Sequence, residues 1–336
     1  MTFEHRTDRP AFELRPIGRQ LALEDFYIWC SSPIWGVDGR VHLFYSRWRK
    51  DRGMSGWING SEIGHAVADS PYDEFRHLDV AVAPRPGSWD ATTCHNPLIK
   101  KIGDGYVLFY IGNSNGRTDT KRIGVATSDS LDGPWRRPDQ PCLLPGPAGT
   151  WDDHCTTNPA FVAGDDGLYW LFYKSWNTTE YETQSGPVRG NRKYGLAKAD
   201  HPLGPYTKVG TEPVIDFSDR PGNAQLEDAF IWRDRSGYRM IARDMGFYNH
   251  QYGLTLSSID GITWSDPTPA YLDLRSYLDE PEPPPHLTKY GRLERPMLLL
   301  DQDSGQPRFL FGGSQGGPSA TATTLVFEIN ERTTDE

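Results

Sequence analysis

Five polar residue pairs recur along the chain, each directly before a proline or an alanine. They are Ser31-Ser32, His95-Asn96, Thr157-Asn158, Glu227-Asp228 and Glu294-Arg295, followed by Pro33, Pro97, Pro159, Ala229 and Pro296. Carboxylates that lie close together can donate and accept protons, and burial beside a like charge raises the pKa of one of them. The pairs therefore predict acid–base chemistry that involves the carboxylates of Glu227, Asp228 and Glu294.

The other members of these pairs are predicted to bind a ligand, since amide, imidazole and guanidinium groups suit hydroxyls and anions. They are His95, Asn96, Asn158, Asp228 and Arg295. The alternative is that the charged pairs only form salt bridges between the last two repeats.

A second pattern places aspartates at matching offsets before three of the pairs. The segments WDATTCHNP (89–97) and WDDHCTTNP (151–159) share Trp, Asp, Asn and Pro, and Asp25 stands at nearly the same place before Pro33. We expect Asp90 and Asp152 to reach the site. Aspartates in such loops also often accept hydrogen bonds from backbone amides, so a structural role fits the pattern equally well.

The variable loops are rich in aromatic, amide and guanidinium side chains. They span residues 47–60, 112–122, 175–193 and 243–251. Aromatic faces stack on ring-shaped ligands, and Arg and Asn bind hydroxyls and carboxylates. The further predicted binding residues are Trp29, Arg47, Trp48, Asp152 and Asp244. His286, in the insertion 279–292, is a weaker candidate because a lone histidine is more often structural.

These residues belong to a unit of sequence that occurs five times. Each unit has a polar-Pro segment, a turn such as Asp166-Gly167, an aromatic-rich strand such as 168–175 and a further strand such as 194–200. The residues Pro33, Pro97, Pro159, Ala229 and Pro296 are separated by 64, 62, 70 and 67 positions. This spacing, without helical periodicity, predicts an all-β, five-bladed β-propeller with four-stranded antiparallel blades around a central channel. The first strand of each blade would line the channel.

We expect residues 1–336 to form a single domain. The predicted blades are approximately 25–90, 91–150, 151–220, 221–275 and 290–330. The fifth unit has only three strands, so residues 12–18 are expected to add its outer strand and close the ring.

Composition excludes several classes of partner. The net charge of −10 is spread along the chain without basic runs, which disfavours nucleic acid. No window is apolar enough to span a membrane, and the first residues lack a secretory apolar region, so we expect a cytoplasmic protein without a membrane partner. Four cysteines, Cys30, Cys94, Cys142 and Cys155, show no metal or disulfide-framework spacing and are expected to be reduced thiols.

The polar-Pro segments, together with the corners DGPW (132–135) and LGPY (203–206), resemble the five-bladed propeller glycoside hydrolases. These include families 43, 32, 62 and 117, with the family 130 phosphorylases as relatives, and the resemblance covers roughly residues 20 to 330. In family 43 the general acid is a Glu two residues before the fourth repeat's anchor, which is the place of Glu227. The family's Asp-Pro at the first and third anchors is replaced by Ser32-Pro33 and Asn158-Pro159. Family 117 uses acids from later blades, which implies Glu294 and Asp228.

The resemblance implies an exo-acting glycoside hydrolase on an oligosaccharide or a plant or algal polysaccharide fragment. In this interpretation Glu227 is the proton donor and Asp90 or Glu294 is the base. Two alternatives stay open: a glycoside phosphorylase or lyase, in which Arg295, Arg243 and His95 hold phosphate or a uronate, and a non-catalytic carbohydrate-binding propeller. No cofactor is required by this chemistry, although carboxylates and carbonyls in the channel would suit a divalent cation such as calcium.

Overall fold

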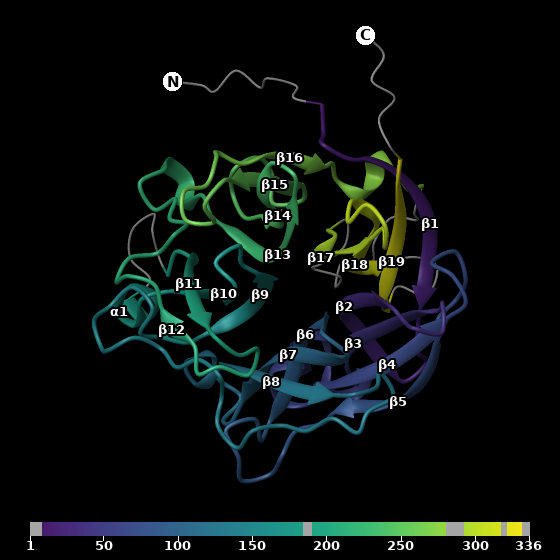
Figure 1. The fold of residues 1–336 in the computed structure, drawn as a ribbon, viewed down its shortest axis with the longest axis horizontal. Helices are drawn as coiled ribbons and strands as arrows, with labels where there is room; N and C mark the ends of the chain where they lie inside the picture. Colours follow the sequence, from purple (N-terminus) through teal and green to yellow (C-terminus); the bar gives the residue numbers. More distant parts are fainter. Residues whose placement is uncertain (1–8, 184–189, 280–291, 317–320, 331–336) are drawn as a thin grey trace.

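The computed structural model describes residues 9–183, 190–279, 292–316 and 321–330 and contains five antiparallel sheets around one axis. Figure 1 shows the sheets as blades, with strands β2, β6, β9, β13 and β17 nearest the centre. The predicted five-bladed β-propeller is confirmed. Helical structure is limited to short segments: α1 (Thr178–Thr183) and the 3₁₀ turns Lys50–Arg52, Met54–Asn59, Thr118–Thr120, Pro221–Asn223 and Leu274–Ser276.

The strands follow the chain from the centre of each blade outward. Blade one contains β2 (Phe26–Trp35), β3 (Val41–Arg49), β4 (Glu62–Ala68) and β5 (Arg76–Val82). Blade two contains β6 (Thr93–Ile102), β7 (Gly105–Asn113) and β8 (Arg122–Ser128). Blade three contains β9 (Thr157–Ala163), β10 (Tyr169–Ser175), β11 (Lys193–Ala199) and β12 (Thr207–Lys208). Blade four contains β13 (Leu226–Asp234), β14 (Gly237–Asp244), β15 (Gly253–Ser258) and β16 (Thr268–Tyr271).

Blade five joins the two ends of the chain. It contains β17 (Glu294–Leu300), β18 (Pro307–Gly316), β19 (Thr321–Asn330) and, as its outer strand, β1 (Glu13–Leu21). Strand β1 pairs antiparallel with β19 from Glu13 opposite Asn330 to Leu21 opposite Thr324, and Figure 1 shows the two side by side. The prediction that the N-terminal segment closes the ring is confirmed, with a strand that continues three residues beyond the expected 12–18.

Blade two departs from the expected four strands, since its sheet has three. Where the outer strand would lie, only isolated bridges form, between Ile123 and Leu143 and between Thr127 and Arg136. The segment 134–147 contains five prolines, which lack the amide proton that a ladder needs. Hydrogen-bonded pairing is therefore interrupted after each bridge.

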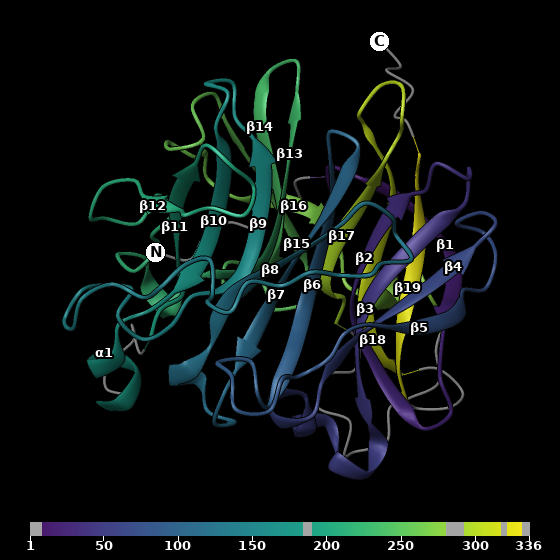
Figure 2. The ribbon, with the colours of Figure 1, turned by 60° about the horizontal axis from the view of Figure 1, so that its bottom comes forward.

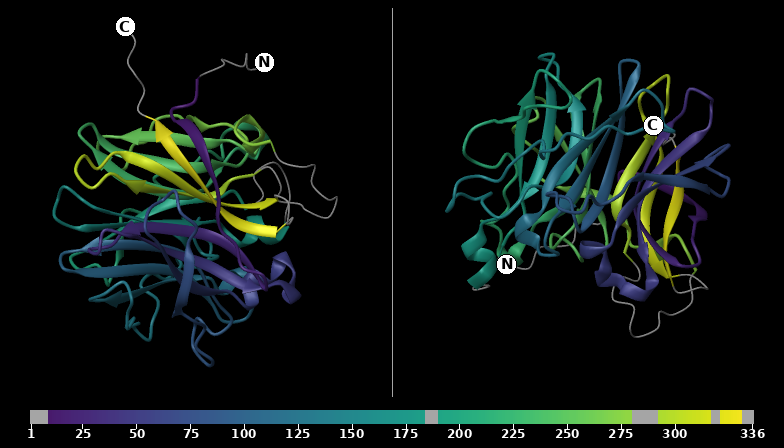
Figure 3. Two further views of the ribbon diagram at one scale, coloured as in Figure 1. Left: turned by 90° about the vertical axis from the view of Figure 1, so that its right-hand side faces the viewer. Right: turned by 90° about the horizontal axis from the view of Figure 1, so that it is seen from below.

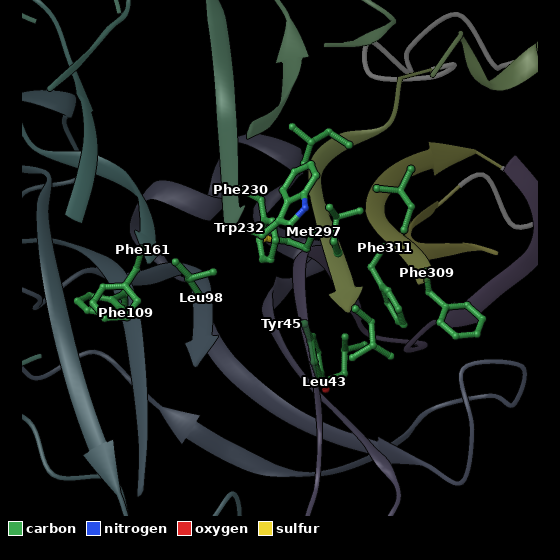
Figure 4. Close-up of a cluster of buried hydrophobic side chains, with 14 of the residues drawn as sticks. Leu43, Tyr45, Leu98, Phe109, Phe161, Phe230, Trp232, Met297, Phe309 and Phe311 are labelled. Atoms are coloured by element: carbon green, nitrogen blue, oxygen red, sulfur yellow. The ribbon is translucent and has the colours of Figure 1, made fainter. Parts of the chain in front are cut away.

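Apolar side chains between neighbouring blades form the core. Figure 4 shows Leu98 and Phe109 of blade two facing Phe161 of blade three, with the rings of Phe109 and Phe161 4.9 Å apart between centroids. Met297 of blade five lies beside Phe230 and Trp232 of blade four. An aromatic pair of this kind adds about 0.5–1.5 kcal/mol beyond the burial of its area. These contacts fix the angle between blades and thereby the positions of the inner strands.

The loops that join the second and third strands of the blades lie at one end of the ring. In Figures 2 and 3, α1 and the turns at residues 50–59 project from the same end. These loops therefore surround one mouth of the channel. Among the described residues, no helix is long and apolar enough to cross a membrane.

Candidate active site

Each of the five inner strands contains one non-glycine residue in the left-handed backbone region. These residues are Cys30, Asn96, Asn158, Asp228 and Arg295, with φ between 48° and 61°. Each lies at an irregularity in the pairing with the next strand, where a bulge re-aims side chains. Such a conformation costs of order 1–3 kcal/mol and tends to occur at functional sites. The left-handed conformation occurs in all five inner strands, which makes the centre of the ring the candidate functional site.

The five left-handed residues are linked by hydrogen bonds around the channel. The Cys30 thiol donates to Asn96 Oδ1 at 2.7 Å, and Asn96 Nδ2 donates to Asn158 Oδ1 at 2.9 Å. Asn158 Nδ2 donates to Asp228 Oδ1 at 2.6 Å. Asp228 in turn accepts from the backbone amide of Arg295 at 3.3 Å. We call these five residues the floor chain, because they connect every blade at the base of the pocket.

The residue before each floor-chain residue also faces the pocket. These residues are Trp29, His95, Thr157, Glu227 and Glu294. Blade one therefore contributes Trp29-Cys30, not the expected Ser31-Ser32. Ser31 instead contacts Thr324, and Ser32 Oγ accepts a hydrogen bond from the amide of Ile99. The error arose because Pro33 stands two residues further along its strand than the prolines of the other blades.

The pocket has a volume of about 220 Å³ and is open to solvent on one side. It contains nine of the predicted site residues: Glu227, Glu294, His95, Asn96, Asn158, Asp228, Arg295, Trp29 and Trp48. His95 is held in place by a 2.9 Å contact between its Nδ1 and Ser61 Oγ and by the rings of Trp48 and Trp57. The predicted convergence of the polar pairs on one axis is thus observed.

Asp90 and Asp152 do not line this pocket, so the sequence-based choice of Asp90 as a base is not supported by its position. Asp90 is fully buried against Arg85 at 3.0 Å and Arg137 at 3.1 Å. It also accepts from the Tyr110 hydroxyl at 2.9 Å, while Trp89 stacks on the same tyrosine ring. Blade three repeats the unit: the Tyr173 hydroxyl donates to Asp152 at 2.8 Å, and Trp151 stacks on Tyr173. The shared Trp-Asp motif is a packing unit of the blade.

Three other candidates also lie outside the pocket. Arg47 pairs with Glu62 at 2.8 Å, and Asp25 is exposed. Asp244 accepts hydrogen bonds from the backbone amides of residues 246–250, so it shapes the loop that follows β14. His286 falls outside the described residues.

The sequence prediction missed three cations of the pocket, Lys121, Lys174 and Arg192. Arg243, considered there only for phosphate or uronate binding, also lines it. Lys174 is on β10 and pairs with Thr157 of β9. Arg243 is on β14 and pairs with Glu227 of β13. Both are charged residues at the end of a mostly apolar strand, and this signal could have identified them.

Glu227 and Glu294 contact the same guanidinium group. Arg243 Nη1 lies 3.6 Å from Glu227 Oε2 and 3.0 Å from Glu294 Oε1. Because one nitrogen reaches both carboxylates, the two acids face each other across the width of a single side chain. Glu227 and Glu294 are therefore the candidate carboxylate pair of the pocket.

Glu227 is further surrounded by positive charge. Lys174 Nζ lies 2.7 Å from Glu227 Oε1 and Arg192 Nε lies 3.3 Å from the same oxygen. Burial of the Glu227 carboxyl raises its pKa, but Lys174, Arg192 and Arg243 outweigh burial and hold the pKa well below the usual range. The direction of this shift does not suit the proton-donor role expected of Glu227, because that expectation did not include these cations. These contacts favour the ionised form of Glu227.

Potential metal ligands gather at one place among the described residues, outside the pocket. His42, His65 and Asp132 hold ligand atoms within 4.8 Å of one another, and His42 Nδ1 lies 2.8 Å from His65 Nε2. In the pocket, Glu227, Asp228 and Glu294 each face a lysine or an arginine, a setting that does not fit calcium. A divalent cation such as calcium in the channel remains an untested expectation.

No protein-family model matches the sequence, and no curated protein shows significant similarity to it. Solved structures, in contrast, match almost the whole chain. A family 117 glycoside hydrolase of the marine bacterium Zobellia galactanivorans is 18% identical, with a TM-score of 0.68 over 95% of this chain and 90% of that one. The chain has the fold of the five-bladed propeller glycoside hydrolases.

Two further solved structures share this fold. BT0996, solved as an RGII complex, is 15% identical, with a TM-score of 0.71 over 96% of this protein and 93% of that one. CoXyl43, a family 43 β-xylosidase/α-arabinofuranosidase from a compost metagenome, is 15% identical, with a TM-score of 0.61 over 94% and 96%. At these identities the likeness concerns the fold, and the activity must be argued from the site.

Proposed function

We propose that this propeller is an exo-acting glycoside hydrolase whose catalytic carboxylates are Glu227 and Glu294. The observation that carries the proposal is their shared contact with Arg243 inside the pocket. Hydrolysis of a glycosidic bond needs one carboxyl group to protonate the leaving oxygen and one carboxylate to activate water or attack the sugar. The structural neighbours support this reaction class, since the family 117 and family 43 proteins are named as glycoside hydrolases.

The proposed roles differ from those expected from the sequence. Glu227 is the ionised partner, because three cations surround it and an acid needs a proton to give. We assign the proton-donor role to Glu294, because it is the other buried carboxylate of the pocket that Arg243 contacts. Asp228 is a positioning residue, held by Asn158 and by the backbone amide of Arg295.

Exo action is supported by the shape of the site. The floor chain links all five blades by hydrogen bonds within the channel, which supports a pocket that takes one end of a sugar chain. The half-buried Trp57, beside His95, offers an aromatic face on which a sugar ring can stack. We therefore expect the enzyme to remove terminal residues.

The decisive experiment is a product analysis with purified protein. Nitrophenyl glycosides and plant and algal oligosaccharides are incubated with the wild-type chain and with Glu294→Gln, and the released sugars are identified by chromatography. Release of single terminal sugars by the wild type and its loss in Glu294→Gln would support the proposal. Internal cleavage would contradict exo action.

The ion pairs around Glu227 favour one second candidate, a non-catalytic carbohydrate-binding propeller. In that case the carboxylates would serve only as counter-ions for the buried lysine and arginines. Binding of an oligosaccharide without turnover, equal in the wild type and in Glu294→Gln, would favour this candidate.

A further inference from the structure

The charge of the pocket is opposite to that of the protein. The whole chain has a net charge of −10. Among the residues that the structure describes, however, the pocket is lined by five cations, Lys121, Lys174, Arg192, Arg243 and Arg295, and by three carboxylates, Glu227, Asp228 and Glu294. A neutral sugar would leave this excess of positive charge without compensation. A cleft lined by one sign of charge attracts ligands of the other sign.

The three carboxylates form ion pairs with four of these cations. Lys174, Arg192 and Arg243 contact Glu227, Arg243 also contacts Glu294, and Arg295 Nη1 lies 3.5 Å from Asp228. Lys121 has no ion-pair partner among the described residues, although the residue is only 7% exposed. A buried cation without a counter-ion has a high free energy, because it has lost its hydration. Binding of an anion beside the Lys121 amine would therefore be favourable.

The surroundings of Lys121 form a recognisable subsite. Its Nζ lies 4.9 Å from the ring centroid of Trp176 and 5.7 Å from that of Trp57. The guanidinium carbon of Arg192 lies 5.3 Å from the same Trp176 ring, and Arg192 is half-buried at the pocket wall. Two cations and two indole faces thus converge from blades one, two and three.

A second cation of the pocket, Arg295, has two donors without partners among the described residues. Arg295 is 1% exposed, and its Nε and Nη2 have no hydrogen-bond partner within the part of the chain that the structure describes. Five donors in a guanidinium are normally satisfied when buried. The unused donors add to the positive potential that the pocket presents to an anion.

We propose that the substrate carries a uronic acid, whose carboxylate is bound by Lys121 and Arg192 beside Trp57 and Trp176. This inference rests on the proposed function, because it names the substrate class of the same pocket. A carboxylate supplies the missing counter-ion, and its sugar ring offers an apolar face to an indole. Phosphate and sulfate share the oxyanion chemistry and are therefore separate arms of the test.

The test compares uronic-acid oligosaccharides with the same oligosaccharides after carboxyl reduction, which replaces each carboxylate by a neutral hydroxymethyl group. Binding to the full chain is measured by isothermal titration calorimetry and by tryptophan fluorescence, in low and high salt. We expect the acidic form to bind about 10-fold to 100-fold more tightly, as for a hydrogen bond to a charged group. High salt should reduce this difference.

The matched variants are Lys121→Met, Lys121→Arg and, as a control, Lys101→Met at an exposed position of β6 outside the pocket. Lys121→Met should lose the preference for the acidic form and keep its affinity for the neutral form. Lys121→Arg should restore part of the preference, and Lys101→Met should leave it unchanged. Circular dichroism and thermal melting of each variant establish that it is folded.

The outcomes separate this inference from the proposed function. Equal binding of the acidic and reduced forms would overturn the inference, while hydrolysis of a neutral sugar would leave the proposed function standing. A strong preference without turnover would support the inference and overturn the proposed function. Inorganic phosphate or a sulfated oligosaccharide could instead bind in a way that depends on Lys121, with no preference for uronates. That result would also overturn the uronate inference. Phosphate-dependent turnover would then identify a phosphorylase.

Discussion

Asn158 donates a 2.6 Å hydrogen bond from Nδ2 to Oδ1 of Asp228, across the boundary between blades three and four. Both residues have a left-handed backbone, and both belong to the floor chain that links the five inner strands. The bond therefore holds Asp228 beside Glu227 and couples the packing of two blades. Its removal should affect the stability of the ring as well as the site.

Replacement of Asn158 by alanine tests this relationship. Asn158→Ala leaves Asp228 Oδ1 without this donor and places a less suitable residue at φ 48°. We expect the free energy of unfolding, measured in urea, to fall by about 1–3 kcal/mol. Asn158→Gly, which tolerates the backbone angle, should recover only the part due to backbone strain. A wild-type unfolding curve for Asn158→Ala would show that the floor chain contributes little.

Strand β1, which closes the ring in blade five, gives a second prediction. Leu14 on β1 is 7% exposed and packs in the core, while its neighbour Glu13 is exposed. Leu14→Ala should lower the free energy of unfolding by about 2–5 kcal/mol, the usual cost of such a truncation in a core. Glu13→Ala should stay within about 0.5 kcal/mol of the wild type. Deletion of residues 1–20 should lower the melting temperature of the whole protein, and an unchanged value would mean that the ring is stable without this strand.

The sequence was sufficient to predict the ring because the features that define it are local. Polar-Pro segments, Gly turns and aromatic strands recur in every blade, and the three-stranded fifth unit implied a strand from the other terminus. The site was only partly predictable. Nothing near Glu227 in the chain reveals Lys174 or Arg192, which reach it from blade three. The Trp-Asp motif was misleading since a repeated residue can serve packing, as Asp90 does with Tyr110.

The division of roles between the two acids gives a third prediction. Glu294→Gln removes the proposed proton donor, so hydrolysis of a natural oligosaccharide should fall by about 10²–10⁴-fold. A nitrophenyl glycoside needs little protonation and should be affected much less. Glu227→Gln removes the ionised carboxylate and should reduce the turnover of both substrates by a similar factor. The rates are measured under single-turnover conditions with matched leaving groups. The reverse pattern would restore Glu227 as the acid.

The pH dependence of the same two rates provides an independent check. Lys174, Arg192 and Arg243 lower the pKa of Glu227, so this group stays ionised through mildly acidic conditions. Activity should therefore not be lost as the pH falls from 6 to the ordinary range of glutamate, about 4.3. Lys174→Met weakens this effect and should move the acidic limb of the profile to higher pH. An acidic limb that does not move would mean that Glu227 does not control it.

Binding of an acidic sugar should depend on the protonation of Lys121. Burial, together with the charges of Lys174 and Arg192, lowers the pKa of this amine to about 8, although Cys155 and Glu227 oppose the shift. The amine is therefore charged below pH 8 and neutral above, while a uronate carboxylate stays ionised throughout. Affinity for the uronic-acid oligosaccharide should fall as the pH rises from 7 to 9, and affinity for the carboxyl-reduced form should not. Lys121→Arg removes the titrating amine but leaves His154, Lys174, Arg192 and Glu227 in place, so its affinity should stay constant over this range. A decrease of the same size in Lys121→Arg would assign the titration to another group and remove Lys121 from the anion subsite.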